Sequence, residues 1–158
     1  MVAIIVVSAG AAFAYFTSTG SGTGSASVGN AGNWKVNVGK STGKMLPGSG
    51  SSTATYTITN QGKGNQAFTT VTATVNADSN GDVTDTTTGA SAAGCEAAWF
   101  TADAGNTDPG AGTPIAAGAT ATGTVTVSLT ETSTNQDPCE GVNPEITVTV
   151  DPTSTPSP

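Results

Sequence analysis

The sequence predicts an all-β protein: a single antiparallel β-sandwich of about seven strands, preceded by an apolar segment. Three observations support this. Apolar residues recur at every second position in five short runs, which is the period of a half-buried strand. No stretch of about 11 residues carries a helical stripe. The 158 residues include 30 Thr and 21 Gly; Thr favours pleated, half-buried surfaces and Gly favours turns.

The strands are expected where apolar and polar side chains alternate. In the first run, Trp34, Val36 and Val38 alternate with Lys35 and Asn37. The later runs place alanine, valine, isoleucine or tyrosine against threonine, so each predicts one core face and one hydroxyl face. These later runs cover residues 54–59, 70–75, 124–129 and 146–150, and a shorter apolar run covers residues 98–100 beside Cys95.

Turn signals separate these runs. They lie at residues 60–62, 80–81 and 108–110 and at Pro138. Residues 114–118 predict a tight turn that feeds a long strand. Short strands with Gly-rich turns at spacings of roughly 10 to 20 residues are typical of antiparallel sandwiches. Residues 58–62 and 114–118 also resemble turns of immunoglobulin-like bacterial surface modules, so we expect an immunoglobulin-like sandwich.

The chain divides into four segments. Residues 1–14 are apolar and uncharged, and as a helix would reach only about 21 Å, short of a hydrocarbon core of about 30 Å. Ala12 and Ala14 fit the −3 and −1 positions of a signal-peptide cleavage site, with the cut before Tyr15, although a basic n-region is missing. The alternative is a buried strand or helix. Residues 15–33 predict a Gly/Ser/Thr linker, residues 34–151 the sandwich, and residues 152–158 a Pro/Thr/Ser tail.

Two cysteines, Cys95 and Cys139, fit an exported protein. In an oxidising compartment two cysteines most often pair. The bond would close a loop of about 44 residues, a constraint that the chain-entropy estimate values at roughly 4 kcal/mol. Two buried free thiols are the alternative, and two cysteines without histidine supply only half a zinc ligand set.

The charged residues argue against nucleic-acid binding and against catalysis. The chain has four Lys, no Arg and 11 acidic residues, with a net charge of −7, so it cannot neutralise a row of phosphates. It has no His, the commonest general base and zinc ligand. We therefore expect no enzyme activity and no cofactor. A glycosidase would need two carboxylates across a cleft, and nothing in the sequence places two of them so. A solvated acidic surface accounts for all seven candidates: Glu96, Asp103, Asp108, Glu131, Asp137, Glu140 and Glu145.

One cluster is a weak calcium candidate. Calcium favours carboxylate and amide oxygens at alternate loop positions, and that spacing is present in the set Asp78, Asn80, Asp82 and Asp85. An EF-hand would need Gly where the chain has Val83 and Glu where it has Gly89. The alternative is a hairpin loop turned at residues 80–81.

Five aromatic residues supply the large side chains expected in the core: Trp34, Tyr56, Phe68, Trp99 and Phe100. The alternative is an exposed platform of aromatic rings for sugars.

Residues 11–19, Ala-Ala-Phe-Ala-Tyr-Phe-Thr-Ser-Thr, resemble the export signals of the TasA/camelysin class, which a dedicated signal peptidase cleaves. Many actinobacterial surface proteins have a similar head. The resemblance spans residues 9–29 and implies a secreted, cell-surface or matrix protein. Some relatives form fibres in which the freed N-terminal segment, here Tyr15 to about Val28, adds as a strand to the next subunit. Some relatives are described as metallopeptidases. We do not expect this activity here, because the chain has no His and no His-Glu-x-x-His motif.

The sequence therefore predicts a non-enzymatic secreted or cell-surface structural protein, which self-associates or binds other surface or matrix components. Its only membrane contact would be through the export segment. Two alternatives remain: an extracellular carbohydrate-binding module that exposes Trp34, Trp99 or Tyr56, and a pilin-like filament subunit or membrane anchor that keeps residues 1–16.

Overall fold

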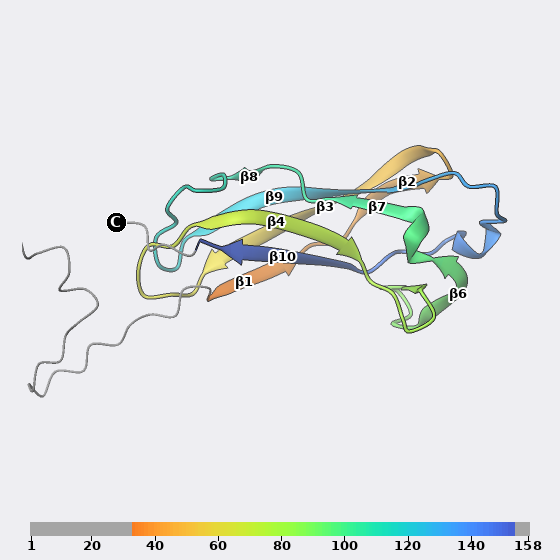
Figure 1. Cartoon of the computed structure of the whole chain (residues 1–158), viewed down its shortest axis with the longest axis horizontal. Coiled ribbons are helices and arrows are strands. Elements are labelled where there is room, and N and C mark those ends of the chain that lie inside the picture. The colour runs from red at the N-terminus through yellow and green to blue at the C-terminus, as the bar shows by residue number, and fades with distance from the viewer. Residues whose placement is uncertain (1–32, 154–158) are drawn as a thin grey trace, which may run out of the picture.

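The computed structural model describes residues 33–153. The predicted export segment with Ala12, Ala14 and Tyr15, nearly all of the predicted linker, and residues 154–158 lie outside the described residues. The described chain is all-β, with two 3-10 turns, η1 (Ala97–Trp99) and η2 (Asp137–Cys139) (Figure 1). Its strands are β1 (Trp34–Val38), β2 (Thr42–Leu46), β3 (Ser49–Asn60), β4 (Phe68–Val75), β5 (Asp82–Thr84), β6 (Ser91–Glu96), β7 (Phe100–Asp103), β8 (Thr107–Asp108), β9 (Thr120–Leu129) and β10 (Ile146–Pro152).

The larger sheet has the order β1-β3-β9-β7, with β2 also paired to β3 and β8 also paired to β9. All of its pairs are antiparallel. β1 and β2 follow one another along the same edge of β3, since Val38 pairs with Tyr56 and Thr42 with Thr53. Residues 39–41 thus lie opposite residues 54–55, which is a β-bulge of one extra residue.

The opposite edge of this sheet has a matching bulge. Asp103 pairs with Thr126 and Thr107 with Gly123, so residues 104–106 lie opposite residues 124–125. The two bulges are level with each other, because residues 54–55 pair with residues 124–125 across the centre of the sheet. Bulges twist a sheet edge away from a partner and disfavour edge-to-edge aggregation.

β4 and β10 form a second antiparallel sheet that faces the first. β4 lies beside β7 and β10 beside β1, so the architecture is sandwich-like. β5 and β6 form a small antiparallel pair at one end of the molecule. Both ends of the described chain, at β1 and at β10, lie at the other end (Figure 1).

The alternating pattern gives β3 and β9 one buried face and one polar face, as the sequence predicts. On β3 and β9 the inward residues are buried and the outward residues are threonines, paired across the strands. Such cross-strand pairs each contribute about 0.2–1 kcal/mol. The four pairs are Thr53–Thr126, Thr55–Thr124, Thr57–Thr122 and Thr59–Thr120.

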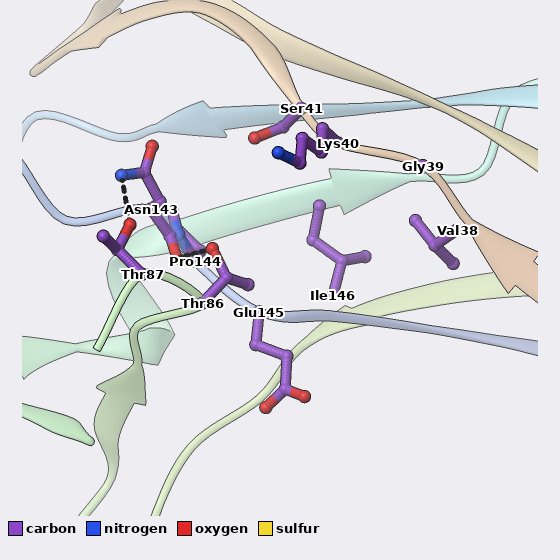
Figure 2. A pocket seen from close by; sticks show the side chains of 10 residues that line it. All are labelled: Val38, Gly39, Lys40, Ser41, Thr86, Thr87, Asn143, Pro144, Glu145 and Ile146. Atoms are coloured by element: carbon purple, nitrogen blue, oxygen red, sulfur yellow. Dashed lines mark hydrogen bonds between the residues drawn. The ribbon is translucent and has the colours of Figure 1, made fainter. Parts of the chain in front are cut away.

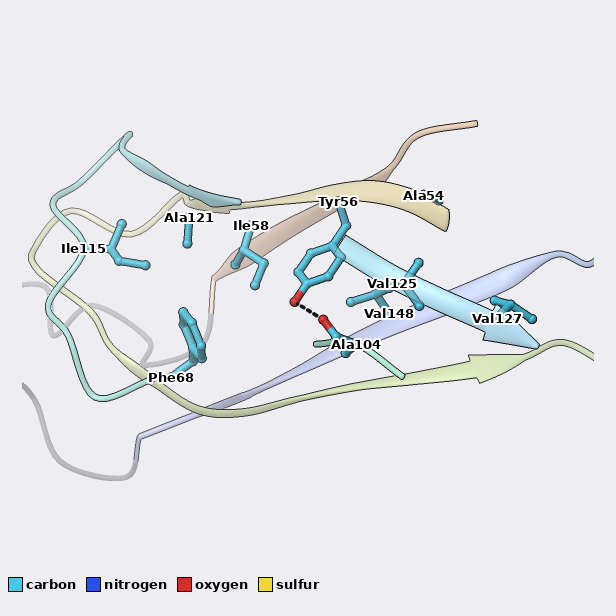
Figure 3. Packing of buried hydrophobic residues seen from close by; sticks show 10 residues of the cluster. All are labelled: Ala54, Tyr56, Ile58, Phe68, Ala104, Ile115, Ala121, Val125, Val127 and Val148. Carbon is cyan, nitrogen blue, oxygen red and sulfur yellow. Dashed lines mark hydrogen bonds between the residues drawn. The ribbon is translucent and has the colours of Figure 1, made fainter. Parts of the chain in front are cut away.

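The core lies between the two sheets (Figure 3). Its buried members are Ala54, Tyr56, Ile58, Phe68, Ala104, Ile115, Ala121, Val125, Val127 and Val148. Tyr56 is fully buried, and its hydroxyl donates a 2.8 Å hydrogen bond to the backbone oxygen of Ala104 in the second bulge. Its ring lies directly over Gly123, where a Cβ would overlap it. Burial raises the pKa of Tyr56, and the carboxylate of Asp103 raises it further.

Asn60, at the end of β3, is also fully buried. Its Nδ2 donates to the backbone oxygens of Gly64 and Ile115, and its Oδ1 accepts from the N–H of Gly62, each at 2.8 Å. One amide side chain thereby joins the turn after β3 to the segment before β9, which explains a polar group in the core.

The sequence-based expectations are mostly confirmed. The five alternating runs are strands, and residues 114–118 form the turn that feeds β9. The run at residues 98–100 is not one continuous strand: η1 ends at Trp99 and β7 begins at Phe100. The described residues form ten strands where about seven are expected, partly because the bulges split each outer strand into two, β1 with β2 and β7 with β8.

Candidate binding groove

A groove of about 810 Å³ runs along β2 at the end of the molecule away from β1 and the C-terminal end of β10. β2 forms one wall, and the segment from Thr130 to Glu145, between β9 and β10, forms the other. A connection of this length without strands is uncommon in a small domain and is usually either functional or disordered. The sequence signalled this segment only by the absence of alternation, so the groove was not predicted.

The Cys95–Cys139 disulfide, expected from the sequence, is present and fixes this outer wall. Its Cα atoms are 4.9 Å apart, and Cys95 on β6 is fully buried. Pro138 packs beside Gly94, where an added Cβ would lie 3.4 Å from the proline Cγ. The wall is therefore attached covalently to β6 rather than only by its own turns.

The floor of the groove is apolar. It includes Met45, Phe100 and Leu129, of which Leu129 is buried. Leu46 is 62% exposed at the lip and is the large hydrophobic residue that the described surface exposes most openly. An apolar floor with a few polar groups at the rim is typical of binding sites.

The rim is acidic. Glu131, Asp137 and Glu140 line it and are exposed, and the cation among the lining residues is Lys44. The Glu131 side chain lies against Gly48 in the β2–β3 turn, where a Cβ would be 2.9 Å from Oε2. Three carboxylates against one ammonium group leave the groove with two net negative charges.

The acidity extends over this whole end of the molecule. Two segments, residues 76–96 and 130–145, carry eight of the 11 acidic residues and no lysine. The disulfide and the contact between Thr86 and Asn143 hold them together, with the Thr86 N–H donating to the Asn143 oxygen at 2.9 Å. This end therefore carries a negative field that attracts cations.

The carboxylates of the calcium candidates accept hydrogen bonds from nearby backbone N–H groups. Asp78 Oδ1 accepts from the N–H groups of Asn80 and Asp82 at 2.8 and 3.0 Å. Asp82 Oδ1 accepts from the Gly94 N–H at 2.9 Å, and Asp85 Oδ1 accepts from the Thr87 N–H at 2.7 Å.

The hairpin expected here as the alternative is present: Ala77 bridges Val83, and the Asp78 N–H donates to the Asp82 oxygen. Hydrogen bonds from the Asn80 N–H, the Ser91 side chain and the Asp82 N–H hold the pKa of Asp78 below its ordinary value. Within residues 33–153 no three His, Cys, Asp or Glu side chains form a group that could hold a metal ion. The calcium hypothesis thus rests on sequence spacing alone.

The aromatic residues lie in or against the core. Tyr56, Phe68 and Trp99 are buried, and Trp34 and Phe100 are half-buried. Trp34 packs edge-on against Phe68, with ring centroids 6.0 Å apart at 85°. These rings do not form an open platform.

A second hollow, of about 550 Å³, lies at the seam between β1 and β10. Figure 2 shows Lys40 and Ser41 on one side and Thr87 and Asn143 across from them, with Asn143 Nδ2 donating to Thr87 Oγ1 at 3.0 Å. Its lining combines Val38 and Ile146 with polar residues of the first bulge, of the turn after β5 and of the segment before β10, and it is smaller than the groove.

Among the described residues no helix is long and apolar enough to cross a membrane. Comparison of the chain with protein-family models, with curated proteins and with solved structures gives no match.

Proposed function

We propose that this protein is a non-enzymatic extracellular structural protein, a subunit of the cell surface or of a secreted matrix that self-associates. The observation that carries the proposal is the Cys95–Cys139 disulfide, which staples the longest connection of the described chain to β6. Disulfides persist in oxidising compartments and are rare in the cytosol.

The shape of the described domain supports a role in display. β1 begins and β10 ends at the same end of an elongated body, and the groove lies at the other (Figure 1). A module held at one end presents the opposite end to its surroundings. The outward threonine pairs keep the broad face of the larger sheet polar and hydrated.

We further propose that the sandwich is of the immunoglobulin-like kind, as the turns at residues 58–62 and 114–118 imply. Two facing antiparallel sheets with a buried tyrosine that ties one sheet to a connecting segment support this. The carbohydrate-binding alternative finds no support in Tyr56 and Trp99, which are buried.

Sedimentation velocity and negative-stain microscopy of the chain starting at Tyr15 test the self-association. We expect larger species to grow with protein concentration, and filaments or sheets in the micrographs. A monodisperse monomer at every concentration and pH would remove the fibre and matrix role.

A further inference from the structure

We propose that the groove between β2 and the segment from Thr130 to Glu145 binds an extended cationic peptide, with lysine or arginine side chains next to apolar ones, that belongs to another protein. This goes beyond the structural role and does not depend on self-association.

The first argument is the match between the groove and two kinds of side chain. Met45, Phe100 and Leu129 offer apolar surface at the floor, and Leu46 extends it at the lip with 62% of its own surface exposed. Burying apolar area yields roughly 25 cal/mol per Å², so an apolar side chain seated here would contribute most of the affinity.

The second argument is charge complementarity. Glu131, Asp137 and Glu140 stand at the rim with Lys44 as the groove's cation. The neighbouring segment, residues 76–96, adds four further carboxylates and no lysine. Complementary charge speeds association and selects the partner more than it raises affinity, so the rim selects a cation beside the apolar anchor.

The third argument is the free edge of β2. β2 pairs with β3 and with no other strand that the structure describes, and residues 43–46 of β2 line the groove beside Ser52, Phe100 and Leu129 of the other strands of the sheet. The unpaired edge of β2 offers backbone donors and acceptors to an extended peptide at the border of the groove. A peptide that alternates apolar and cationic residues would direct the first to the floor and the second to the rim.

A second copy of the chain is the weaker candidate for this groove. Each copy carries a net charge of −7 with only four lysines, so two copies repel each other at the acidic end. A positively charged partner is attracted to this acidic end, whereas a second copy is repelled by it.

The test is fluorescence anisotropy with a labelled heptapeptide of alternating leucine and lysine, titrated with the disulfide-intact protein at low and at physiological salt. Two comparison peptides separate the contributions: one replaces leucine by serine, and one replaces lysine by glutamate. We expect both to bind at least about tenfold more weakly than the leucine–lysine peptide, a difference of about 1.4 kcal/mol, since each lacks either the apolar anchor or the complementary charge.

Three variants locate the site. Glu131→Gln with Glu140→Gln, and separately Leu46→Ala, should each weaken the leucine–lysine peptide about five- to tenfold. The matched control is Asp108→Asn with Asp151→Asn, two exposed carboxylates outside the groove lining and outside residues 76–96, which should change binding less than twofold. Far-UV circular dichroism checks that each variant is folded; the replaced side chains are exposed, so all should be.

Three results would overturn the proposal. Equal binding of the serine–lysine peptide, or equal weakening by the Asp108→Asn, Asp151→Asn control, would show general attraction of cations to an acidic protein. No binding of the leucine–lysine peptide at millimolar concentration would show that the groove has no such role. A change in sedimentation, with peptide binding unaltered, in the Leu46→Ala variant would make the groove a contact between copies.

Discussion

Gly123 on β9 is the position at which one added methyl group should damage the fold most clearly. The Cβ of an alanine there would overlap Cζ and Oη of Tyr56 and lie 2.9 Å from its Cε1. Overpacking a tight core costs about 1–3 kcal/mol, and displacing the ring also strains the 2.8 Å hydrogen bond to Ala104, worth about 1 kcal/mol. We expect Gly123→Ala to lower the free energy of unfolding by about 2–4 kcal/mol.

The assay is urea unfolding followed by tryptophan fluorescence. With a slope of about 2 kcal/mol per molar urea, the midpoint should fall by about 1–2 M. The control is Gly64→Ala, because a Cβ at Gly64 meets nothing within 4 Å. Gly64 lies in the bend after β3 and its φ is not positive, so alanine there should leave the free energy of unfolding unchanged or raise it by up to about 1 kcal/mol. A Gly123→Ala variant as stable as the wild type, or more stable, would refute the placement of Tyr56 over Gly123.

Three further predictions concern the same fold. Tyr56→Phe should lower the free energy of unfolding by about 1–3 kcal/mol in urea unfolding, because it leaves a buried carbonyl without its donor; no change would mean that water replaces the hydroxyl. The double variant Cys95→Ala, Cys139→Ala should have a free energy of unfolding about 4 kcal/mol below that of the wild type, and dithiothreitol should no longer change its stability. A double variant that dithiothreitol still destabilises would contradict the bond. Asp78 has a lower pKa in the folded than in the unfolded protein, so its ionised form stabilises the fold above about pH 4, and this contribution is lost as the pH falls through the folded pKa. Asp78→Ala should therefore lower the thermal midpoint more at pH 7 than at pH 2; the exposed control Glu96→Ala should not show this pattern, and an equal loss for Asp78→Ala at both pH values would contradict it.

The strands could be predicted because burial on one face leaves a record in the sequence. Val36, Ile58 and Val148 each lie between polar neighbours, and each faces the core or packs against it. The disulfide could be predicted because two cysteines most often pair in a chain for which the sequence predicts export.

The bulges could not be predicted, because register between distant strands decides them. Gly39 and Gly105 resemble the other glycines of the chain, and only the pairing of β3 with β9 brings the two bulges level. The groove escaped prediction for a similar reason. It exists because β2 and the segment before β10, about a hundred residues apart, lie side by side.

At residues 78–85 the sequence spacing suggests a calcium site, whereas the structure uses the same carboxylates as hydrogen-bond acceptors in a hairpin. Alternate oxygens fit a calcium loop, and they fit equally well a hairpin whose carboxylates accept hydrogen bonds from neighbouring N–H groups. Sequence spacing does not distinguish the two, because both need short acidic side chains beside a tight turn. In the structure these carboxylates accept such bonds from Asn80, Gly94 and Thr87.

The central claim, an extracellular structural protein, is tested most directly by intact mass and N-terminal sequencing of the protein from its native cells, separated into culture medium, cell surface and cytosol. We predict protein outside the membrane that starts at Tyr15, with a mass two hydrogens below that of the reduced chain. Protein confined to the cytosol with both cysteines reduced would contradict it. A retained apolar segment on surface-bound protein would instead favour the pilin-like or anchored form over the freely secreted one.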